Sequence, residues 1–178
     1  LSLYYQSDKI TNYFKDSFSG MEIVYAIEPY PLGTGGAIMN SFKKVKEDHV
    51  YVLNGDTFMD LNFSNIEIIW QENKLNIVVL KEISEASRYG LVKVDGKYIK
   101  SFNEKLNSGS GLINAGVYIL RKDLFQNKKL SEVFSFELDF LNQEVRNNPT
   151  QYYKSDGLFI DIGIPEDYHK AQSLLRNA

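Results

Sequence analysis

Short apolar runs alternate with amphipathic stretches along the first part of the chain. Runs rich in β-branched and aromatic residues predict strands at residues 1–5, 21–27, 50–53 and 76–80. Apolar positions at helical spacing predict helices at residues 9–14, 35–44 and 62–72, the first capped by Ser7 or Asp8 and the last by Asn62 or Ser64. Alternation of strands and helices at this spacing predicts a mostly parallel sheet with right-handed crossovers.

The pattern changes after Glu82, where hairpins replace the alternation. Residues 91–94 and 98–102 flank an Asp-Gly turn and predict one hairpin. Residues 151–154 and 158–160 flank a second Asp-Gly turn and predict another hairpin. The later half of the chain is therefore expected to build a second wall opposite the parallel sheet, with a cleft between them.

The remaining elements complete an α/β fold. A strand is expected at residues 112–120, a helix at 137–145 with Ser135 as its cap, and a last helix that begins with Pro165. We predict a Rossmann-like, mostly parallel sheet flanked by helices, with a hairpin-rich half. At this length the chain is expected to form a single domain over residues 1–178.

Composition narrows the classes of function. The net charge of −3 gives no electrostatic footprint for nucleic acid. Cysteine is absent, which excludes disulfides, thiolate zinc sites and a thiol nucleophile. No apolar run reaches the roughly 18 residues of a membrane helix, and no signal-peptide pattern opens the sequence. We therefore expect a cytoplasmic protein.

A run of small residues, PLGTGGA at positions 31–37, follows the second predicted strand. Its glycines let a backbone approach a flat or charged ligand closely, because they carry no Cβ. The run lacks both the dinucleotide-binding fingerprint and the lysine of a P-loop. At the start of a predicted helix it favours backbone recognition of a base or a sugar edge.

Two carboxylates follow apolar strands. Asp56 lies in an Asn-Gly-Asp turn after residues 50–53, and Asp161 follows the apolar run 158–160. Strand ends are where open α/β sheets bind ligands, and a buried carboxylate needs a partner. Both suit Mg²⁺, with phosphate oxygens as further ligands. The alternatives are a plain turn role for Asp56 and capping of the last helix for Asp161.

Further polar positions lie at strand ends or interrupt strands. Lys105 suits a phosphate and Glu104 suits sugar hydroxyls, although Glu-Lys pairs also occur by chance. Asn114 interrupts an apolar strand and needs a partner, either a ligand hydroxyl or a backbone carbonyl. Gly116 in the same strand indicates a bulge or a close backbone approach. Gly90 precedes another strand and offers a backbone amide to the same cleft.

Aromatic and histidine residues have structural explanations. The run FSFELDF at residues 134–140 predicts the start of an amphipathic helix with its phenylalanines in the core, while Glu137 is left open. His49 and His169 are far apart in the sequence and lack metal-ligand spacing, so we interpret both as surface residues.

The order of these motifs resembles that of the sugar-1-phosphate nucleotidyltransferases. The motifs are EP at 28–29, PLGTGGA at 31–37, NGD at 54–56, RYG at 88–90, EK at 104–105, NAG at 114–116 and DIGIPEDY at 161–168. The resemblance covers essentially the whole chain and implies the nucleotide-diphospho-sugar transferase fold. In that family a sugar 1-phosphate oxygen attacks the α-phosphorus of an NTP, and pyrophosphate leaves.

The resemblance also implies roles for individual residues. Nucleotide binding falls to Pro31, Gly33, Thr34, Gly55 and Asp56, with Pro31 and Gly33 against the base. Catalytic roles fall to Asp56, Lys105 and Asp161, of which Asp56 and Asp161 hold Mg²⁺ and Lys105 holds the sugar phosphate. Sugar binding falls to Gly90, Glu104, Lys105, Asn114 and Glu137.

The substrates are the least determined part of the resemblance. The Thr-Gly-Gly form of the loop and the SFE at residues 135–137 resemble most the members that use GTP and a heptose 1-phosphate. The alternatives are a mannose- or glucose-1-phosphate nucleotidyltransferase and a non-catalytic regulatory domain that binds a nucleotide sugar. A homo-oligomer is a further expectation.

One family motif is absent from this sequence. The first strand of the family, its Gly-Gly-x-Gly-Thr-Arg loop and a downstream Pro-Lys have no counterpart here. That loop binds the triphosphate, so we expect an N-terminally incomplete chain that is poorly active by itself. The missing strand would leave neighbouring strands with open edges, which predicts self-association.

Overall fold

The computed structural model describes residues 1–105 and 109–177. The chain packs into two compact units, one made of residues 1–48 and 122–144 and the other of residues 49–121 and 145–178. The prediction of a single domain stays a prediction. Within the described residues, no helix is long and apolar enough to cross a membrane.

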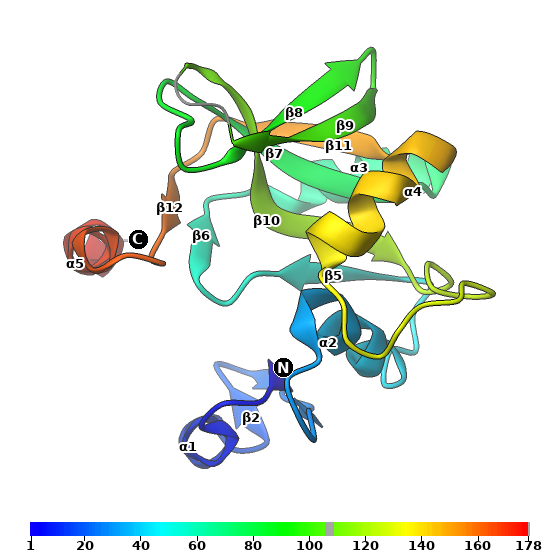
Figure 1. The fold of residues 1–178 in the computed structure, drawn as a ribbon. Helices are drawn as coiled ribbons and strands as arrows, with labels where there is room; N and C mark the ends of the chain where they lie inside the picture. Colours follow the sequence, from blue (N-terminus) through cyan, green and yellow to red (C-terminus); the bar gives the residue numbers. More distant parts are fainter. Residues whose placement is uncertain (106–108, 178) are drawn as a thin grey trace. The chain divides into compact units, whose positions relative to one another are not determined.

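The second unit is built on a six-stranded sheet (Figure 1). In spatial order its strands are β5 (His49–Leu53), β10 (Gly111–Arg121), β7 (Ile77–Ile83), β11 (Gln151–Ser155), β9 (Tyr98–Lys105) and β8 (Gly90–Asp95). β10 runs antiparallel between β5 and β7, and β11 runs parallel to β7. The α/β class is confirmed, although the inserted β10 makes neighbouring pairs mostly antiparallel while β5, β7 and β11 keep one direction.

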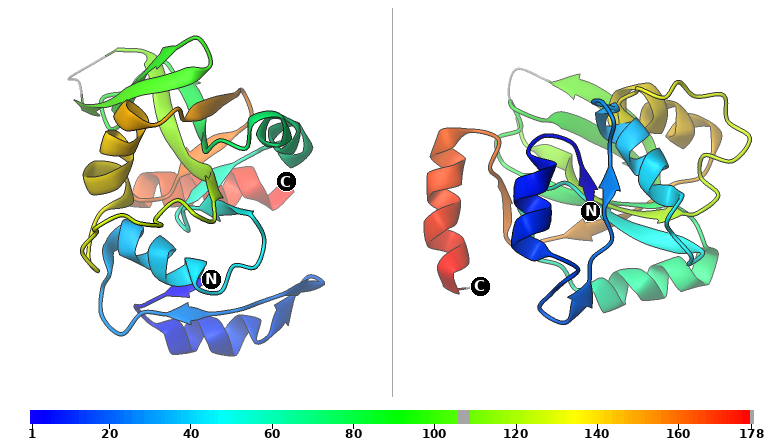
Figure 2. Two further views of the ribbon diagram at one scale, coloured as in Figure 1. Left: turned by 90° about the vertical axis from the view of Figure 1, so that its right-hand side faces the viewer. Right: turned by 90° about the horizontal axis from the view of Figure 1, so that it is seen from below.

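Helix α3 (Phe63–Asn73) runs along one face of this sheet (Figures 1 and 2). Its predicted cap is correct, because the Asn62 side chain accepts a hydrogen bond of 3.2 Å from the backbone N–H of Asn65. Ile66 and Trp70 turn inward and join a cluster with buried residues of β7 and β10. This apolar layer fixes the strands whose ends carry the candidate site.

Strand β10 contains the bulge that Gly116 predicts. Its register against β7 shifts between Asn114 and Tyr118, and Gly116 has a φ of +70°. A Cβ on Gly116 would lie 2.7 Å from the side-chain nitrogen of Asn54, so the backbone at Gly116 also approaches Asn54 closely. The bulge therefore holds the turn that follows β5.

The first predicted hairpin is confirmed and the second is wrong. β8 and β9 pair antiparallel around Gly96. β11 instead joins the large sheet, and β12 (Phe159–Asp161) pairs with β6 (Thr57–Met59) in a separate two-stranded ladder. Between β11 and β12, Gly157 packs closely against the chain, since a Cβ there would be 2.2 Å from the carbonyl oxygen of Asp60. The chain leaves the sheet there rather than folding back, because β11 finds a buried neighbour in β7.

The last helix, α5 (Pro165–Leu174), begins with proline as predicted and continues into the short 3₁₀ turn η2 (Leu175–Asn177). Glu166 and Asp167 lie in its first turn, where the helix dipole favours negative charge. The DIGIPEDY motif therefore begins at the last residue of β12 and ends in the first turns of α5.

The first unit contains two small ladders. β1 (Ser2–Leu3) and β4 (Ala26–Ile27) pair in parallel and lie side by side in Figure 2, and β2 (Ser17–Phe18) pairs with β3 (Met21–Glu22). The strand predicted at residues 21–27 is thus split, since its two ends have different partners. α1 (Ser7–Phe14) begins after Gln6 with no side-chain cap, so the caps predicted at Ser7 and Asp8 are wrong.

The rest of the first unit packs around phenylalanines. Its helices are α2 (Gly33–Phe42) and the π-helix η1 (Phe136–Leu141); α4 (Asn142–Asn147) follows η1 in the sequence and has its last residues in the second unit. The Ser135 side chain accepts a hydrogen bond from the N–H of Leu138, which confirms it as a cap. The rings of Phe125, Phe134, Phe136 and Phe140 contact one another, which confirms their core role.

Candidate functional site

The two candidate aspartates lie next to each other along the β6–β12 ladder of the second unit, Asp161 at the end of β12 and Asp56 just before β6. Thr57, which follows Asp56, is opposite Asp161 in the β6–β12 ladder. The N–H of Ile162 donates a hydrogen bond of 2.9 Å to the carbonyl oxygen of Asp56, which extends the ladder by one step. Strand pairing therefore places the backbones of two aspartates that are far apart in the sequence next to each other.

The local hydrogen bonds of these aspartates bear on the two structural alternatives. Asp161 does not cap α5, because that helix has no side-chain cap and begins after Ile164. Its Oδ1 instead accepts a hydrogen bond of 2.8 Å from the N–H of Gly163. Asp56 accepts only a long contact of 3.5 Å from the Thr57 hydroxyl. Both carboxylates thus keep acceptor capacity toward a ligand.

The described residues contain no cluster of three or more histidine, cysteine, aspartate or glutamate side chains suited to a metal ion. A cation at Asp56 and Asp161 would therefore depend on oxygen atoms from a ligand. Such a site suits Mg²⁺, which usually binds one or two carboxylates together with substrate phosphates and water.

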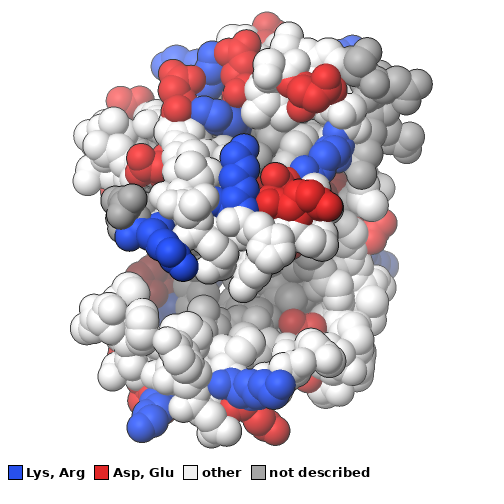
Figure 3. Space-filling model, turned by 90° about the vertical axis from the view of Figure 1, so that its left-hand side faces the viewer, with Lys and Arg blue, Asp and Glu red and all other residues white. Residues whose placement is uncertain are grey.

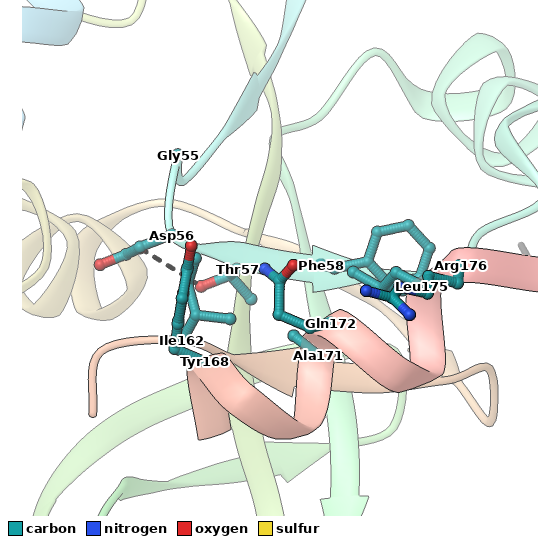
Figure 4. A pocket seen from close by; sticks show the side chains of 10 residues that line it. All are labelled: Gly55, Asp56, Thr57, Phe58, Ile162, Tyr168, Ala171, Gln172, Leu175 and Arg176. Carbon is teal, nitrogen blue, oxygen red and sulfur yellow. Dashed lines mark hydrogen bonds between the residues drawn. The ribbon is translucent and has the colours of Figure 1, made fainter. Parts of the chain in front are cut away.

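A cavity of about 360 Å³ runs from this turn along α5 (Figure 4). It is lined by Gly55, Asp56, Thr57, Phe58, Ile162, Tyr168, Ala171, Gln172, Leu175 and Arg176. Asp56 and Arg176 lie toward its opposite ends, and the Asp56 carboxylate points away from Arg176. The sequence analysis did not predict that α5 contributes to this lining. The signal that could have shown it is the helix that begins at Pro165, within the DIGIPEDY motif.

The RYG motif lies beside Asp161. Arg88 donates a hydrogen bond of 2.5 Å to Asp167 in the first turn of α5. This bond raises the pKa of the Arg88 guanidinium, and the negative charge of Asp161 adds to the effect. Burial raises the pKa of Tyr89, and Asp161 again contributes. The Arg88–Asp167 pair was not foreseen from the sequence, and it joins two of the family motifs.

Charges elsewhere on the surface follow the same local pairing. On the face drawn in Figure 3, acidic and basic residues lie among one another with uncharged residues between them. Lys154 and Glu82 form one such pair at 2.5 Å on neighbouring parallel strands. This distribution agrees with the small net charge of −3.

The EK motif meets the RYG motif across a strand pair. Gly90 at the start of β8 is opposite Lys105 at the end of β9. A Cβ on Gly90 would lie 2.6 Å from the carbonyl oxygen of Asn103, so the pairing itself requires glycine. Glu104 precedes Lys105 in β9, and the side chains of both lie outside what the structure describes.

Asn114 has found partners within the protein. Its side-chain nitrogen donates to the Tyr118 hydroxyl at 2.8 Å, and its Oδ1 accepts from the N–H of Gly116 at 3.0 Å. The carbonyl oxygen of Gly116 in turn accepts from the N–H of Asn54 at 2.9 Å. Asn114 therefore stabilises the bulge, and the bulge positions the turn before Asp56.

The glycine-rich run lies in the first unit, where its glycines have a packing role. Gly33 has a φ of +70°, and a Cβ on it would lie 2.6 Å from the carbonyl oxygen of Phe134. A Cβ on Gly35 would lie 2.1 Å from the Phe134 ring, and one on Gly36 would lie 2.2 Å from the carbonyl oxygen of Glu132. Close approach to residues 132–134 thus explains the small residues without a ligand.

Two other candidates of the first unit contact each other. The Thr34 hydroxyl donates to Glu137 at 2.9 Å and accepts from the N–H of Phe136 at 2.8 Å. Pro31 is exposed beside Leu32, whose N–H donates to the Glu28 carboxylate at 3.0 Å. The structure therefore links a residue expected to bind nucleotide with one expected to bind sugar.

The interpretation of His49 as a surface residue is wrong. Its ring stacks on the buried Trp70 at 3.7 Å and lies 3.0 Å from the Glu67 carboxylate. Glu67 also accepts from the Tyr51 hydroxyl, and burial together with this bond raises the pKa of Tyr51 to about 12. His169 is exposed on α5 as expected. The His49 cluster stabilises α3 on the sheet.

Comparison with known proteins agrees with the motifs. A family model described as nucleotidyl transferase matches residues 1–178. A D-glycero-α-D-manno-heptose 1-phosphate guanylyltransferase of Campylobacter jejuni is 45% identical over 170 residues, which cover 95% of this chain and 75% of that protein. The protein of the same name from Aneurinibacillus thermoaerophilus is 41% identical over 178 residues, with 99% and 77% covered.

Solved structures give the same result. HddC from Yersinia pseudotuberculosis complexed with GMP-PN has a TM-score of 0.87 and 35% identity, with 99% of this chain and 77% of that chain covered. A putative glucose-1-phosphate thymidylyltransferase from Bacillus anthracis shares the fold, with a TM-score of 0.82 at 17% identity and 97% and 73% coverage. The predicted nucleotide-diphospho-sugar transferase fold is confirmed.

Proposed function

The chain belongs to the nucleotidyl transferase family, and we propose that the protein transfers GMP from GTP to D-glycero-α-D-manno-heptose 1-phosphate. The observation that carries this proposal is the 45% identity to a guanylyltransferase of that name over 95% of the chain. The adjoining backbone positions of Asp56, just before β6, and Asp161, at the end of β12, support it from the geometry. A non-catalytic sensor would not need two such carboxylates.

In the proposed reaction an oxygen of the sugar 1-phosphate attacks the α-phosphorus of GTP. A new phosphorus–oxygen bond forms, the bond to the bridging β-phosphate oxygen breaks, and pyrophosphate leaves with the electron pair. Catalysis of this kind depends on positioning and charge neutralisation. We propose that Lys105, at the end of β9, neutralises the negative charge of the sugar phosphate.

Nucleotidyltransferases of this family generally use a divalent metal. We propose Mg²⁺, held by the carboxylates of Asp56 and Asp161. The residues fit, because both are hard oxygen donors on adjoining strand ends and neither is consumed by an ion pair with lysine or arginine among the described contacts. When bound, the cation would neutralise negative charge on the α-phosphate.

The other roles follow the two units of the chain. In the first, we assign base recognition to Pro31 and Gly33, a place in the nucleotide-binding loop to Thr34, and a sugar contact to Glu137. In the second, we assign nucleotide contacts to Gly55 and sugar contacts to Gly90, Glu104 and Asn114. The Gly90 amide and Lys105 belong to one strand pair, which supports a common ligand for them.

Product analysis tests the substrates directly. Protein expressed from the reading frame that encodes this chain is incubated with each NTP and with heptose, mannose and glucose 1-phosphates, and nucleotide sugars are separated by chromatography. GTP with heptose 1-phosphate is expected to give the highest kcat/KM. The mannose 1-phosphate arm matters, because a putative mannose-1-phosphate guanyltransferase of Sulfolobus acidocaldarius is 32% identical over 173 residues. Higher kcat/KM in that arm would overturn the heptose assignment.

We also propose a cytoplasmic location and self-association. The location follows from the substrates, since GTP and sugar phosphates are cytoplasmic metabolites. Self-association is supported in the first unit by exposed aromatic and apolar side chains, among them Tyr5, Tyr13 and Met21. Light scattering tests the assembly, and a monodisperse monomer at all concentrations would contradict it.

A further inference from the structure

The hydroxyl of Thr34 lies between the glycine-rich loop and helix η1. The backbone N–H of Phe136 donates to it at 2.8 Å, and the hydroxyl lies 2.9 Å from Oε2 of Glu137. A hydroxyl has a single hydrogen to donate. Because the Phe136 N–H occupies an acceptor position, that hydrogen is directed at the Glu137 carboxylate.

The same carboxylate oxygen is approached from the η1 side. The Ser135 hydroxyl lies 3.4 Å from Oε2 of Glu137, and it accepts from the N–H of Leu138 at 3.2 Å as the helix cap. The Ser135 N–H is held by Asp139 at 2.7 Å. Side chains of η1 and its cap therefore fix the start of the helix. Thr34 connects that start to the glycine-rich loop.

The backbone ties the loop to the same segment. The N–H of Gly35 donates to the carbonyl oxygen of Phe134 at 3.0 Å, and the N–H of Phe134 donates to the carbonyl oxygen of Leu32 at 3.1 Å. The Thr34 hydroxyl thus lies within a short ladder between residues 32–35 and 134–136. A shift of the loop would move the hydroxyl relative to Glu137.

The π-helical form of η1 bears on function as well. Helices with this hydrogen-bond pattern are rare, and they occur frequently at functional sites. η1 covers residues Phe136–Leu141 and places Glu137 in its first turn, with Phe136 and Phe140 buried on the other side. Buried rings hold the helix in place, so the direction of Glu137 depends on its polar contacts.

We propose that Thr34 is a positioning residue that acts through Glu137 on the sugar, rather than a contact of the base. The inference rests on the proposed function, in which Glu137 accepts a hydrogen bond from a sugar hydroxyl. The Thr34 hydroxyl sets the rotamer of Glu137 and so the direction in which its carboxylate meets the sugar. Through the ladder, the loop that binds the nucleotide also orients the sugar contact.

The test compares Thr34→Val with Thr34→Ser in steady-state kinetics. Valine keeps the shape and removes the hydroxyl, whereas serine keeps the hydroxyl. Thr34→Val is expected to raise the KM for the sugar 1-phosphate about tenfold, as for loss of one charge-assisted hydrogen bond, and the KM for GTP by less than about twofold. Thr34→Ser is expected to restore the sugar KM to within about threefold of wild type.

Thr11→Val provides a matched control, because Thr11 also donates a hydroxyl hydrogen bond but lies in the exposed helix α1. It should change neither KM. Equal rises in both KM values for Thr34→Val, or failure of serine to restore the sugar KM, would overturn the inference. A larger effect on GTP than on the sugar would return Thr34 to base recognition and would overturn it too.

Glu137→Ala keeps the inference testable if the valine variant does not fold. It is expected to raise the sugar KM at least as much as Thr34→Val, and the double variant should be no worse than Glu137→Ala. An unchanged sugar KM in Glu137→Ala sinks the inference by itself. Failure of the proposed function is distinguishable, because the wild-type protein would then transfer no nucleotide to any sugar phosphate.

Discussion

The N–H of Ile162 donates to the carbonyl oxygen of Asp56 at 2.9 Å, one step beyond the β6–β12 ladder. A backbone bond at this position fixes the separation of Asp56 and Asp161 more tightly than side-chain contacts would. Carboxylates on neighbouring backbone positions can bind one cation together with oxygen atoms of a ligand. The arrangement is thus suited to a metal that arrives with its ligand.

Substitution of the two aspartates tests that arrangement. Asp56→Asn and Asp161→Asn are each expected to lower kcat by at least about 100-fold, because each removes a negative charge that would hold the metal ion. The double variant should be little worse than either single variant, since the two act as a unit. Activity is measured against MgCl₂ concentration. Asp156→Asn, in an exposed turn, is the control, and an equal loss there would refute the assignment.

Gly116 gives a prediction about stability. Gly116→Ala places a Cβ 2.7 Å from the Asn54 side chain at a φ of +70°, so both strain and a clash are expected. We expect the free energy of unfolding to fall by about 2–3 kcal/mol, measured by urea denaturation. Gly96→Ala has a φ of +55° but open space around its Cβ. It should cost about 1 kcal/mol, and equal losses would argue against the close approach.

The strand-end residues were predictable from the sequence and the small pairings were not. Asp56 and Asp161 follow apolar runs, which marks both as residues near strand ends, but Asp161 belongs to β12, outside the sheet that contains β5. The partner of Asp161 is the three-residue strand β6, which is too short to show a periodic pattern. The second hairpin failed for a related reason, because an Asp-Gly turn predicts a reversal but does not report that β7 competes for β11.

The glycine-rich run shows a different limit. Its composition predicts a close backbone approach to a ligand, and in the structure the residues that approach its glycines closely are Phe134 and Glu132. Sequence cannot distinguish a ligand from a distant segment of the same chain. The prediction for His49 failed for the same reason, since only the fold shows that its ring contacts Trp70 and Glu67.

The Arg88–Asp167 pair predicts a small, salt-sensitive coupling. Its side chains are 43% and 24% exposed, so solvent screens much of the attraction. A double-mutant cycle with Arg88→Met and Asp167→Asn is expected to give a coupling of about 0.2–1 kcal/mol in the free energy of unfolding, lower at high salt. The Lys154–Glu82 pair is the control with similar geometry. A coupling above about 2 kcal/mol would mean that the pair is effectively buried.

Tyr51 predicts a pH dependence of stability at the alkaline end. Burial and the hydrogen bond to Glu67 raise its pKa in the folded state to about 12, from 10.0 in the unfolded chain. The folded state therefore holds the proton more tightly, and this contribution is complete below pH 10 and is lost as the pH rises toward 12. In Tyr51→Phe the group is absent, so the difference in unfolding free energy between wild type and variant should shrink over that interval.

Urea denaturation at several pH values between 8 and 12 measures this difference, with the window set by the two pKa values of Tyr51. Tyr13→Phe is the matched control for loss of a tyrosine hydroxyl, because Tyr13 is largely exposed on α1. A constant gap between wild type and Tyr51→Phe would mean that Tyr51 ionises alike in both states. The hydrogen bond from Tyr51 to Glu67 would then contribute nothing to holding α3 on the sheet, and the cluster would depend on the contacts of His49 with Trp70 and Glu67.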